Sequence, residues 1–148
     1  MVVEYVHNPL YRTTNNIYSL WLVGNKIQEP FLLVESDLIF EAGLLEGLLI
    51  PDKIAVSPML PWMNGMAILM DSSGHVASFQ GASATRGVPA TCGVPSTQNV
   101  LVESLHDRAF KTVNICSLSR ATWGRLLPRL EQAIAAGRVN SYYEVVLA

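Results

Sequence analysis

The sequence has no long apolar run, little charge and almost no cysteine. No run approaches the length of a membrane span, and the start MVVEYVHNPLY lacks the basic region and apolar core of a secretory signal. We therefore expect a cytoplasmic protein that does not act in a membrane. Charged residues make up only 15% of the 148 residues and the net charge is −2. A chain with so little charge offers no basic surface for nucleic acid or anionic lipid.

The two cysteines, Cys92 and Cys116, stand far apart in the sequence and lack metal-ligand spacing. Reduced thiols are therefore expected, rather than a disulfide or a zinc site. Hydrophobic residues make up 50% of the chain. That fraction is enough for the core of one domain, and the length does not suffice for two.

The stretch from residue 15 to residue 40 predicts a helix, a break and a buried strand. Apolar residues recur in its first half with the period of an amphipathic helix. These residues are Ile17, Leu20, Trp21 and Ile27. Candidate caps precede the helix at Thr13, Thr14 and Asn15. The apolar run 31–34 follows Pro30 and is typical of a strand covered on both faces.

Asp37 follows that strand directly, after Glu35 and Ser36. In open α/β sheets, ligands bind beyond the carboxyl ends of the strands. An aspartate at such a position can hold a hard divalent cation against phosphate oxygens. It can equally cap the segment that begins near Glu41, and from the residues alone both interpretations stay open.

The rest of the chain alternates between expected helices and strands. Apolar periodicity predicts a helix in EAGLLEGLL with Leu44, Leu45, Leu48 and Leu49 on one face, and a helix after Ser119 that either kinks or restarts at Pro128 and closes at Gly137. Strands are expected at 53–57, in a hairpin around the turn DSSGH, at 111–118 and in the final run YYEVVL. We therefore expect a single α/β domain over 1–148, with a mostly parallel sheet flanked by helices and an antiparallel hairpin at one edge.

Two loops stand apart from this alternation. Residues 81–99 are rich in Gly, Ala, Ser, Thr and Pro, which predicts a flexible insertion loop. The loop SPMLPWMNG carries Trp62, which can stack on a ligand or face a quaternary ammonium, or can anchor the core.

Four blocks of the sequence resemble one enzyme family. They are NPLYRTTNNIYSLWL, FLLVESDLIF with the following LLEGLL, KTVNICSLSRATW and GRVNSYYEVVL. The family is that of the sugar-phosphate and alcohol-phosphate nucleotidyltransferases, and within it the cytidylyltransferases for phosphocholine, inositol phosphate or aminoethylphosphonate. The resemblance covers residues 6–80 and 110–148 and lapses in the loop between them.

The resemblance implies a Rossmann-like sheet and transfer of a nucleotidyl group, CMP from CTP first, to a small phosphorylated alcohol, sugar or phosphonate. It implies that Asp37 holds Mg²⁺ as the catalytic and metal residue. It also implies that Asn16 and Ser19 contact the base, where a helix cap and a solvated helix position are the alternatives. Trp62 and Glu144 are candidates for the acceptor pocket.

Two parts of the family pattern have no counterpart in this sequence. Family members begin with a strand and a glycine-rich loop that holds the triphosphate, and they place a second metal-binding aspartate beyond the last strand. An incomplete nucleotidyltransferase domain is therefore expected, whether as a fragment or as a degenerate member. The alternative function is a catalytically inactive binding or interaction module, in the form of a homodimer for example.

Overall fold

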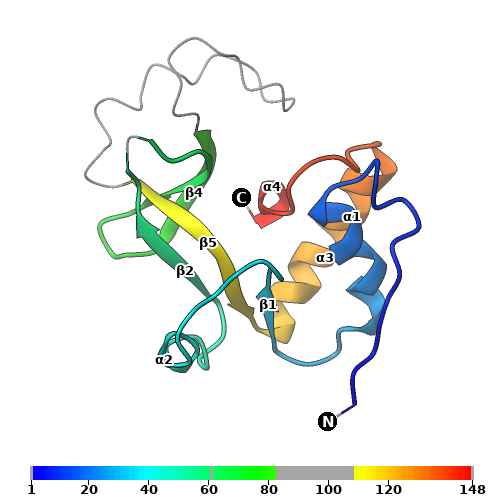
Figure 1. Cartoon of the computed structure of the whole chain (residues 1–148), viewed down its shortest axis with the longest axis horizontal. Coiled ribbons are helices and arrows are strands. Elements are labelled where there is room, and N and C mark those ends of the chain that lie inside the picture. Colours follow the sequence, from blue (N-terminus) through cyan, green and yellow to red (C-terminus); the bar gives the residue numbers. More distant parts are fainter. Residues whose placement is uncertain (1, 61, 83–108, 148) are drawn as a thin grey trace. The chain divides into compact units, whose positions relative to one another are not determined.

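The structure is a computed structural model that describes residues 2–60, 62–82 and 109–147 (Figure 1). Its helices are α1 (Asn16–Val23), the 3-10 turn η1 (Gly24–Lys26), α2 (Gly43–Glu46), α3 (Arg120–Ala135) and α4 (Glu144–Leu147). Its strands are β1 (Phe31–Val34), β2 (Lys53–Pro58), β3 (Gly65–Met70), β4 (Val76–Ala82) and β5 (Ala109–Leu118).

The chain divides into two compact units. The first comprises Met1–Leu33, Ile39–Lys53 and Cys116–Ala148, as far as these are described. The second comprises Val34–Leu38 and the described part of Ile54–Ile115. The first unit holds α1, α3 and α4, and the second holds the β3–β4 hairpin.

The five strands form one sheet in the order β1-β5-β3-β4, and β2 also pairs with β5. Strand β3 is antiparallel to both of its neighbours, and Ile68 lies opposite Phe79 on one side and Phe110 on the other. The α/β class and the hairpin are therefore confirmed. The mostly parallel sheet is wrong for β3, because apolar strand composition does not specify strand direction. The finer Rossmann-like assignment stays a prediction.

Strand β1 is less buried than its apolar composition predicts. Its residues alternate between half-buried and exposed, with Leu32 exposed by 38% and Val34 by 39%. Alternation of this kind is typical of a strand covered on one face, so the expectation of cover on both faces is wrong. Four apolar residues in a row cannot by themselves distinguish the two cases.

Helix α1 packs against α3 (Figure 1), and α3 carries a buried indole, Trp123. Asn15 caps α1 by accepting a hydrogen bond from the N–H of Asn16 at 2.7 Å, as one of the three expected caps. The Trp123 ring is 4% exposed and meets Phe31 edge to face at 5.2 Å between ring centroids. Its Nε1–H donates to the carbonyl of Gly24 at 3.3 Å, which satisfies the one polar atom that the ring buries.

Helix α3 is continuous through Pro128, so the helix does not restart there. Ser119 caps its start by accepting from the N–H of Thr122 at 3.1 Å. At its end, Gly137 adopts φ 76° and donates to the carbonyl of Ile134, while Arg138 donates to the carbonyl of Ala133. These two bonds form a Schellman motif, whose left-handed residue is most often glycine.

Two expected elements differ in the structure. The leucine-rich helix is reduced to α2, and of its four leucines only Leu48 is buried, while Leu49 is 74% exposed. Gly43 and Gly47 explain the short length, because glycine lowers helix propensity and a short helix gains little from cooperativity. The run YYEVVL forms the helix α4 in place of a strand. Local bonds from Val146 to Tyr143 and neighbouring pairs replace the strand pairing that its β-forming residues predict.

Most of the expected insertion loop lies outside the described residues, as does Cys92. Of that loop, residues 81 and 82 end β4. No helix within the described ranges is long and apolar enough to cross a membrane.

The Schellman motif predicts opposite effects for two glycines of the α3 region. We expect Gly137→Ala to lower the free energy of unfolding by about 1 kcal/mol, because alanine is strained at positive φ. Gly124→Ala lies in the exposed middle of α3, where an added Cβ meets nothing within 4 Å. It should raise the free energy of unfolding by about 0.5–1 kcal/mol. Urea unfolding of both variants measures these changes in the free energy of unfolding. If both variants changed it equally and in the same direction, the Schellman motif at Gly137 would be contradicted.

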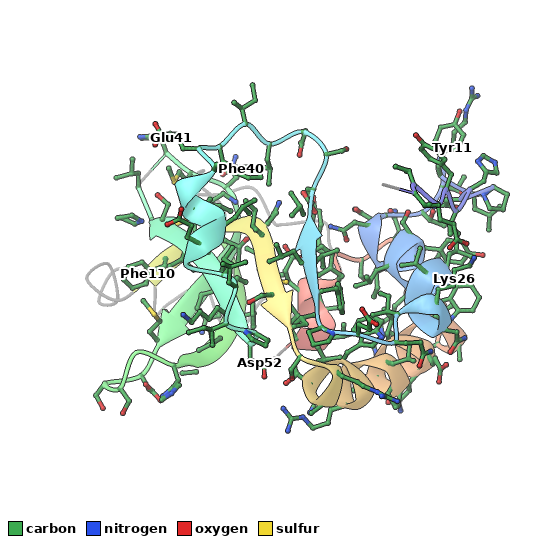
Figure 2. The ribbon with its side chains drawn as sticks, turned by 90° about the horizontal axis from the view of Figure 1, so that it is seen from below. Tyr11, Lys26, Phe40, Glu41, Asp52 and Phe110 are labelled. Atoms are coloured by element: carbon green, nitrogen blue, oxygen red, sulfur yellow. The ribbon has the colours of Figure 1, made fainter. Side chains whose placement is uncertain are left out.

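Asp52 links the loop before β2 to the start of α3 (Figure 2). Its Oδ1 accepts from the N–H of Ser119 at 2.9 Å, and its own N–H donates to the carbonyl of Ser117 at 2.9 Å. Its φ is 65°, which aspartate tolerates better than most residues. The bond from the Ser119 N–H holds the pKa of this carboxyl below its ordinary value, and the Ser119 and Thr122 hydroxyls and Arg125 act in the same direction against burial.

A pH-dependent stabilisation follows from Asp52. A carboxyl with a lowered folded-state pKa stabilises the fold above its unfolded pKa, near about 4, and loses this effect as the pH falls through the folded value. We expect Asp52→Asn to cost about 0.5–1 kcal/mol at pH 7 and progressively less below about pH 4. Asp52→Ala should lower the free energy of unfolding further, because it removes the acceptor oxygen and places alanine at a positive φ, where it is strained. Unfolding curves from pH 3 to 7 test this, and a gap between wild type and Asp52→Asn that widens toward acid would contradict it.

Candidate functional site

The predicted site residues fall in different compact units. Asn16, Ser19 and Glu144 belong to the first unit, and Asp37 and Trp62 belong to the second. The structure brings Asn16 close to the residue before Glu144 within the first unit. Each group is therefore described within its own unit.

Asp37 lies in the turn directly after β1, with an exposed side chain. The position beyond the carboxyl end of the strand is confirmed. Asp37 is three residues past Val34, and Glu35 lies between them at the strand's end. An exposed carboxylate at a strand end can take part in a site that a ligand completes.

Glu35 anchors this turn to β5 through Asn114. The Glu35 N–H donates to the Asn114 carbonyl at 3.3 Å, and the Asn114 Nδ2–H donates to Glu35 Oε2 at 2.7 Å. Thr112 Oγ1 in turn donates to Asn114 Oδ1 at 3.0 Å, and the Thr112 side chain is buried. We call these three residues, Glu35, Thr112 and Asn114, the clasp.

Asn114 has φ 57° in the middle of a ten-residue strand. Asparagine is one of the few residues with a side chain that visits this left-handed region. The sequence places Asn114 correctly within a strand but does not reveal this role. The available signal was a polar, turn-forming residue between apolar neighbours, Val113 and Ile115.

Asn16 and Ser19 both make hydrogen bonds within the first unit. The Asn16 Oδ1 accepts from the N–H of Tyr143 at 2.9 Å, which ties α1 to the segment that begins α4. Ser19 is exposed, and its Oγ accepts from the Nδ2–H of Asn8 at 3.1 Å. Asn15, not Asn16, is the helix cap, so the cap alternative for Asn16 is wrong.

Glu144 lies in α4, where its side chain is 3% exposed. It lies near Cys116, and burial together with the charge of Glu144 raises the pKa of the Cys116 thiol to about 12. A thiol of that pKa stays protonated at neutral pH, which makes Cys116 a poor nucleophile. Cys116 is a free thiol among the described residues, and because Cys92 lies outside them the expectation of reduced thiols stays a prediction.

Trp62 is 71% exposed, so it does not anchor the core. An exposed indole in a loop keeps the ligand interpretation open, since its face can stack on a base or meet an ammonium group.

If Asp37 binds a metal ion, the substrate would have to supply part of the ligands. Within the ranges that the structure describes, no three His, Cys, Asp or Glu residues are grouped as a metal site. Mg²⁺ commonly uses one or two carboxylates, several waters and substrate phosphates. The exposed Asp37 carboxylate fits that type of site, and it does not fit an all-protein cage.

A pocket of about 300 Å³ in the first unit is a poor phosphate site. Its walls are mostly apolar, from Pro30, Phe31, Leu32, Leu48, Leu49, Pro51, Ser117 and Leu118. The hydroxyl of Ser117 donates to the carbonyl of Ile50 at 3.2 Å and accepts from the Lys53 N–H at 3.3 Å. The pocket therefore offers little to bind a charged ligand.

Comparison with curated proteins relates the chain distantly to a nucleotidyltransferase-like enzyme. That relative is CMP-5′-(3-aminopropyl)phosphonate synthase from Streptomyces rubellomurinus (strain ATCC 31215), which is 28% identical over 153 residues. The match covers 100% of this chain and 22% of the relative, so the chain spans about a fifth of the relative's length. No family model matches the chain.

The bond from Tyr143 to Asn16 predicts that Asn16 stabilises the fold whatever else it does. Asn16→Ala removes the acceptor of the Tyr143 N–H and should lower the free energy of unfolding by about 1–2 kcal/mol. Asn16→Asp keeps an acceptor oxygen and should cost less. Ser19→Ala is the matched control on the same helix, and because Ser19 is exposed it should cost under about 0.5 kcal/mol. Thermal unfolding measures the stability of the three variants. If Asn16→Ala were as stable as the wild type, the bond from Tyr143 to Asn16 would not stabilise the fold.

Proposed function

We propose that this chain is a nucleotidyltransferase-like domain that takes part in transferring CMP from CTP to a small phosphonate or phosphorylated acceptor. The observation that carries the proposal is the similarity over the whole chain to a CMP-phosphonate synthase. An exposed aspartate at the end of β1 supports it, since ligands of α/β sheets bind at such strand ends.

The proposed reaction is a displacement at phosphorus. An oxygen of the acceptor's phosphonate or phosphate attacks the α-phosphorus of CTP, a new phosphorus–oxygen bond forms, and the bond to the β-phosphate breaks. Pyrophosphate leaves with the electron pair of that bond. The protein supplies no covalent nucleophile, so its contribution is positioning and charge stabilisation.

Each candidate residue has a role in this scheme. Asp37 would hold Mg²⁺, which when bound offsets negative charge on phosphate oxygens. Asn16 and Ser19 orient the base, beside the bonds that they make within the chain. Trp62 offers an exposed aromatic face for the acceptor. The Glu144 carboxylate is buried, so it would meet a cationic group of the acceptor only if the side chain became exposed.

A binding or interaction module is the second candidate function, and the bonds of Asn16 and Ser19 favour it. Both side chains already have partners within the fold, so structural demands alone explain Asn16. In this case the chain binds a partner, such as a second copy of itself, without catalysing transfer.

Titration of the chain with CTP separates the two functions. We expect CTP to bind in the presence of Mg²⁺ with roughly millimolar affinity, about 4 kcal/mol, because no three acidic, histidine or cysteine residues are grouped as a metal site in the described ranges and the nucleotide itself must supply most of the ligands. Asp37→Asn should abolish the Mg²⁺-dependent part of this affinity. Glu41→Gln changes another exposed carboxyl nearby in sequence and should leave it unchanged.

The measurement is an NMR or calorimetric titration with Mg²⁺ and again with EDTA, followed by an assay for pyrophosphate release with an aminoalkylphosphonate. We expect negligible turnover. Absence of any CTP binding by the wild type would contradict nucleotidyl transfer and favour the interaction module. Rapid pyrophosphate release would contradict the expected lack of turnover.

A further inference from the structure

The clasp is an unusual arrangement for the interior of a strand. A residue other than glycine at positive φ costs free energy, and it persists only where its surroundings fix it. Asn114 adopts such a conformation, with φ 57°, between Val113 and Ile115 in β5. Its side chain and its carbonyl both bond to Glu35, which is 79 residues away in sequence.

Each polar atom of the Asn114 amide group has an assigned partner. The Nδ2–H donates to Glu35 Oε2 at 2.7 Å, a length typical of a bond to a charged acceptor. Oδ1 accepts from the Thr112 hydroxyl at 3.0 Å. The Thr112 oxygen also lies 3.5 Å from the carbonyl of Met66, and since one hydroxyl has one proton the shorter contact is the better bond. Thr112 therefore fixes which way the amide faces.

The clasp holds the residue at the start of the turn that carries Asp37. Two hydrogen bonds fix Glu35, one through its backbone N–H and one through its side chain. Asp37 is the second residue after Glu35, so the direction of its carboxylate depends on the backbone that the clasp fixes. Asp37 itself is exposed, and it lies in the turn beyond the last residue of β1.

We propose that Asn114 is a positioning residue for Asp37, which it orients through Glu35. This inference rests on the proposed function as far as the role of Asp37 toward Mg²⁺ and nucleotide is concerned. Residues that orient a metal-binding carboxylate commonly change metal affinity about 10–100-fold when they are replaced. Asn114 combines a left-handed backbone with a side chain and a carbonyl that both bond to Glu35.

The first test measures the turn directly, by amide hydrogen exchange of residues 35–37. Asn114→Gly keeps the permitted backbone conformation and removes the amide group, so it isolates the side-chain bond. We expect exchange at these residues to rise at least tenfold, while exchange in α3 stays unchanged. Glu35→Ala should act in the same way. Unchanged exchange at 35–37 in both variants would overturn the proposal, whatever the nucleotide results are.

The second test uses Mg²⁺–CTP as the probe, and it compares affinity with Mg²⁺ and with EDTA. Asn114→Gly and Glu35→Ala should lower the Mg²⁺-dependent gain in affinity about tenfold and leave the metal-free affinity unchanged. The double variant E35Q/N114D exchanges donor and acceptor within the pair and should recover most of the gain. A merely structural role would lower stability without this selective loss and recovery.

The outcomes separate the two proposals. If the wild type shows an Mg²⁺-dependent gain that Asn114→Gly does not reduce, Asn114 does not position Asp37. If the wild type shows no such gain, the proposed function fails, and the exchange experiment alone decides whether the clasp orders the turn. Thr112→Val provides a further variant in case Asn114→Gly does not fold, since it removes only the hydroxyl that orients the amide; unchanged exchange at 35–37 in this variant would count against the clasp.

Discussion

Hydrogen bonding along β5 is the interaction on which the rest of this structure depends. β5 pairs with β3 in an antiparallel register, with β1 and with β2, and Ser119 immediately after it caps α3. Polar side chains on β5 also fix segments far away in sequence. Asn114 holds Glu35, and Ser117 binds the loop before β2. A strand with these functions must be buried, and its last four residues, 115–118, are all buried. A one-residue shift in the register of β5 would therefore disturb both the core and the candidate site, because every side chain of the strand would move to the opposite face.

Local signals in the sequence predicted the elements better than their arrangement. The cap at Asn15, the cap at Ser119, the hairpin and the closing glycine Gly137 were all predictable, because each depends on the chemistry of a few adjacent residues. Whether neighbouring strands are parallel or antiparallel was not predictable, because an apolar run has the same composition in either case. The helix α4 was missed for a related reason. The β-forming residues of YYEVVL favour a strand, but the segment is held by Asn16 and by its own local bonds. Tertiary contacts then decide the conformation.

The candidate site was predictable at the level of single residues and not at the level of their partners. The exposed position of Asp37 after a strand follows from the apolar run and the carboxylate that ends its turn. The clasp does not follow from sequence, because it joins residues 79 positions apart and depends on one left-handed residue within a strand. The same holds for Asn16, whose partner Tyr143 is 127 residues away. Polar residues in conspicuous motifs can thus serve the fold and a ligand together, and only the structure shows the first of these uses.

Two of the three tryptophans, Trp62 and Trp123, differ sharply in their access to water. Trp123 is buried, contacts Phe31 and donates a hydrogen bond to the carbonyl of Gly24, whereas the Trp62 side chain is largely exposed to solvent. The first belongs to one compact unit and the second to the other. A small ionic quencher dissolved in water collides with the exposed indole and is shut out from the buried one. Beside the half-buried Trp21, the chain therefore contains two contrasting fluorescent probes, one sensitive to events at the surface of the hairpin unit and one sensitive to the integrity of the helical unit.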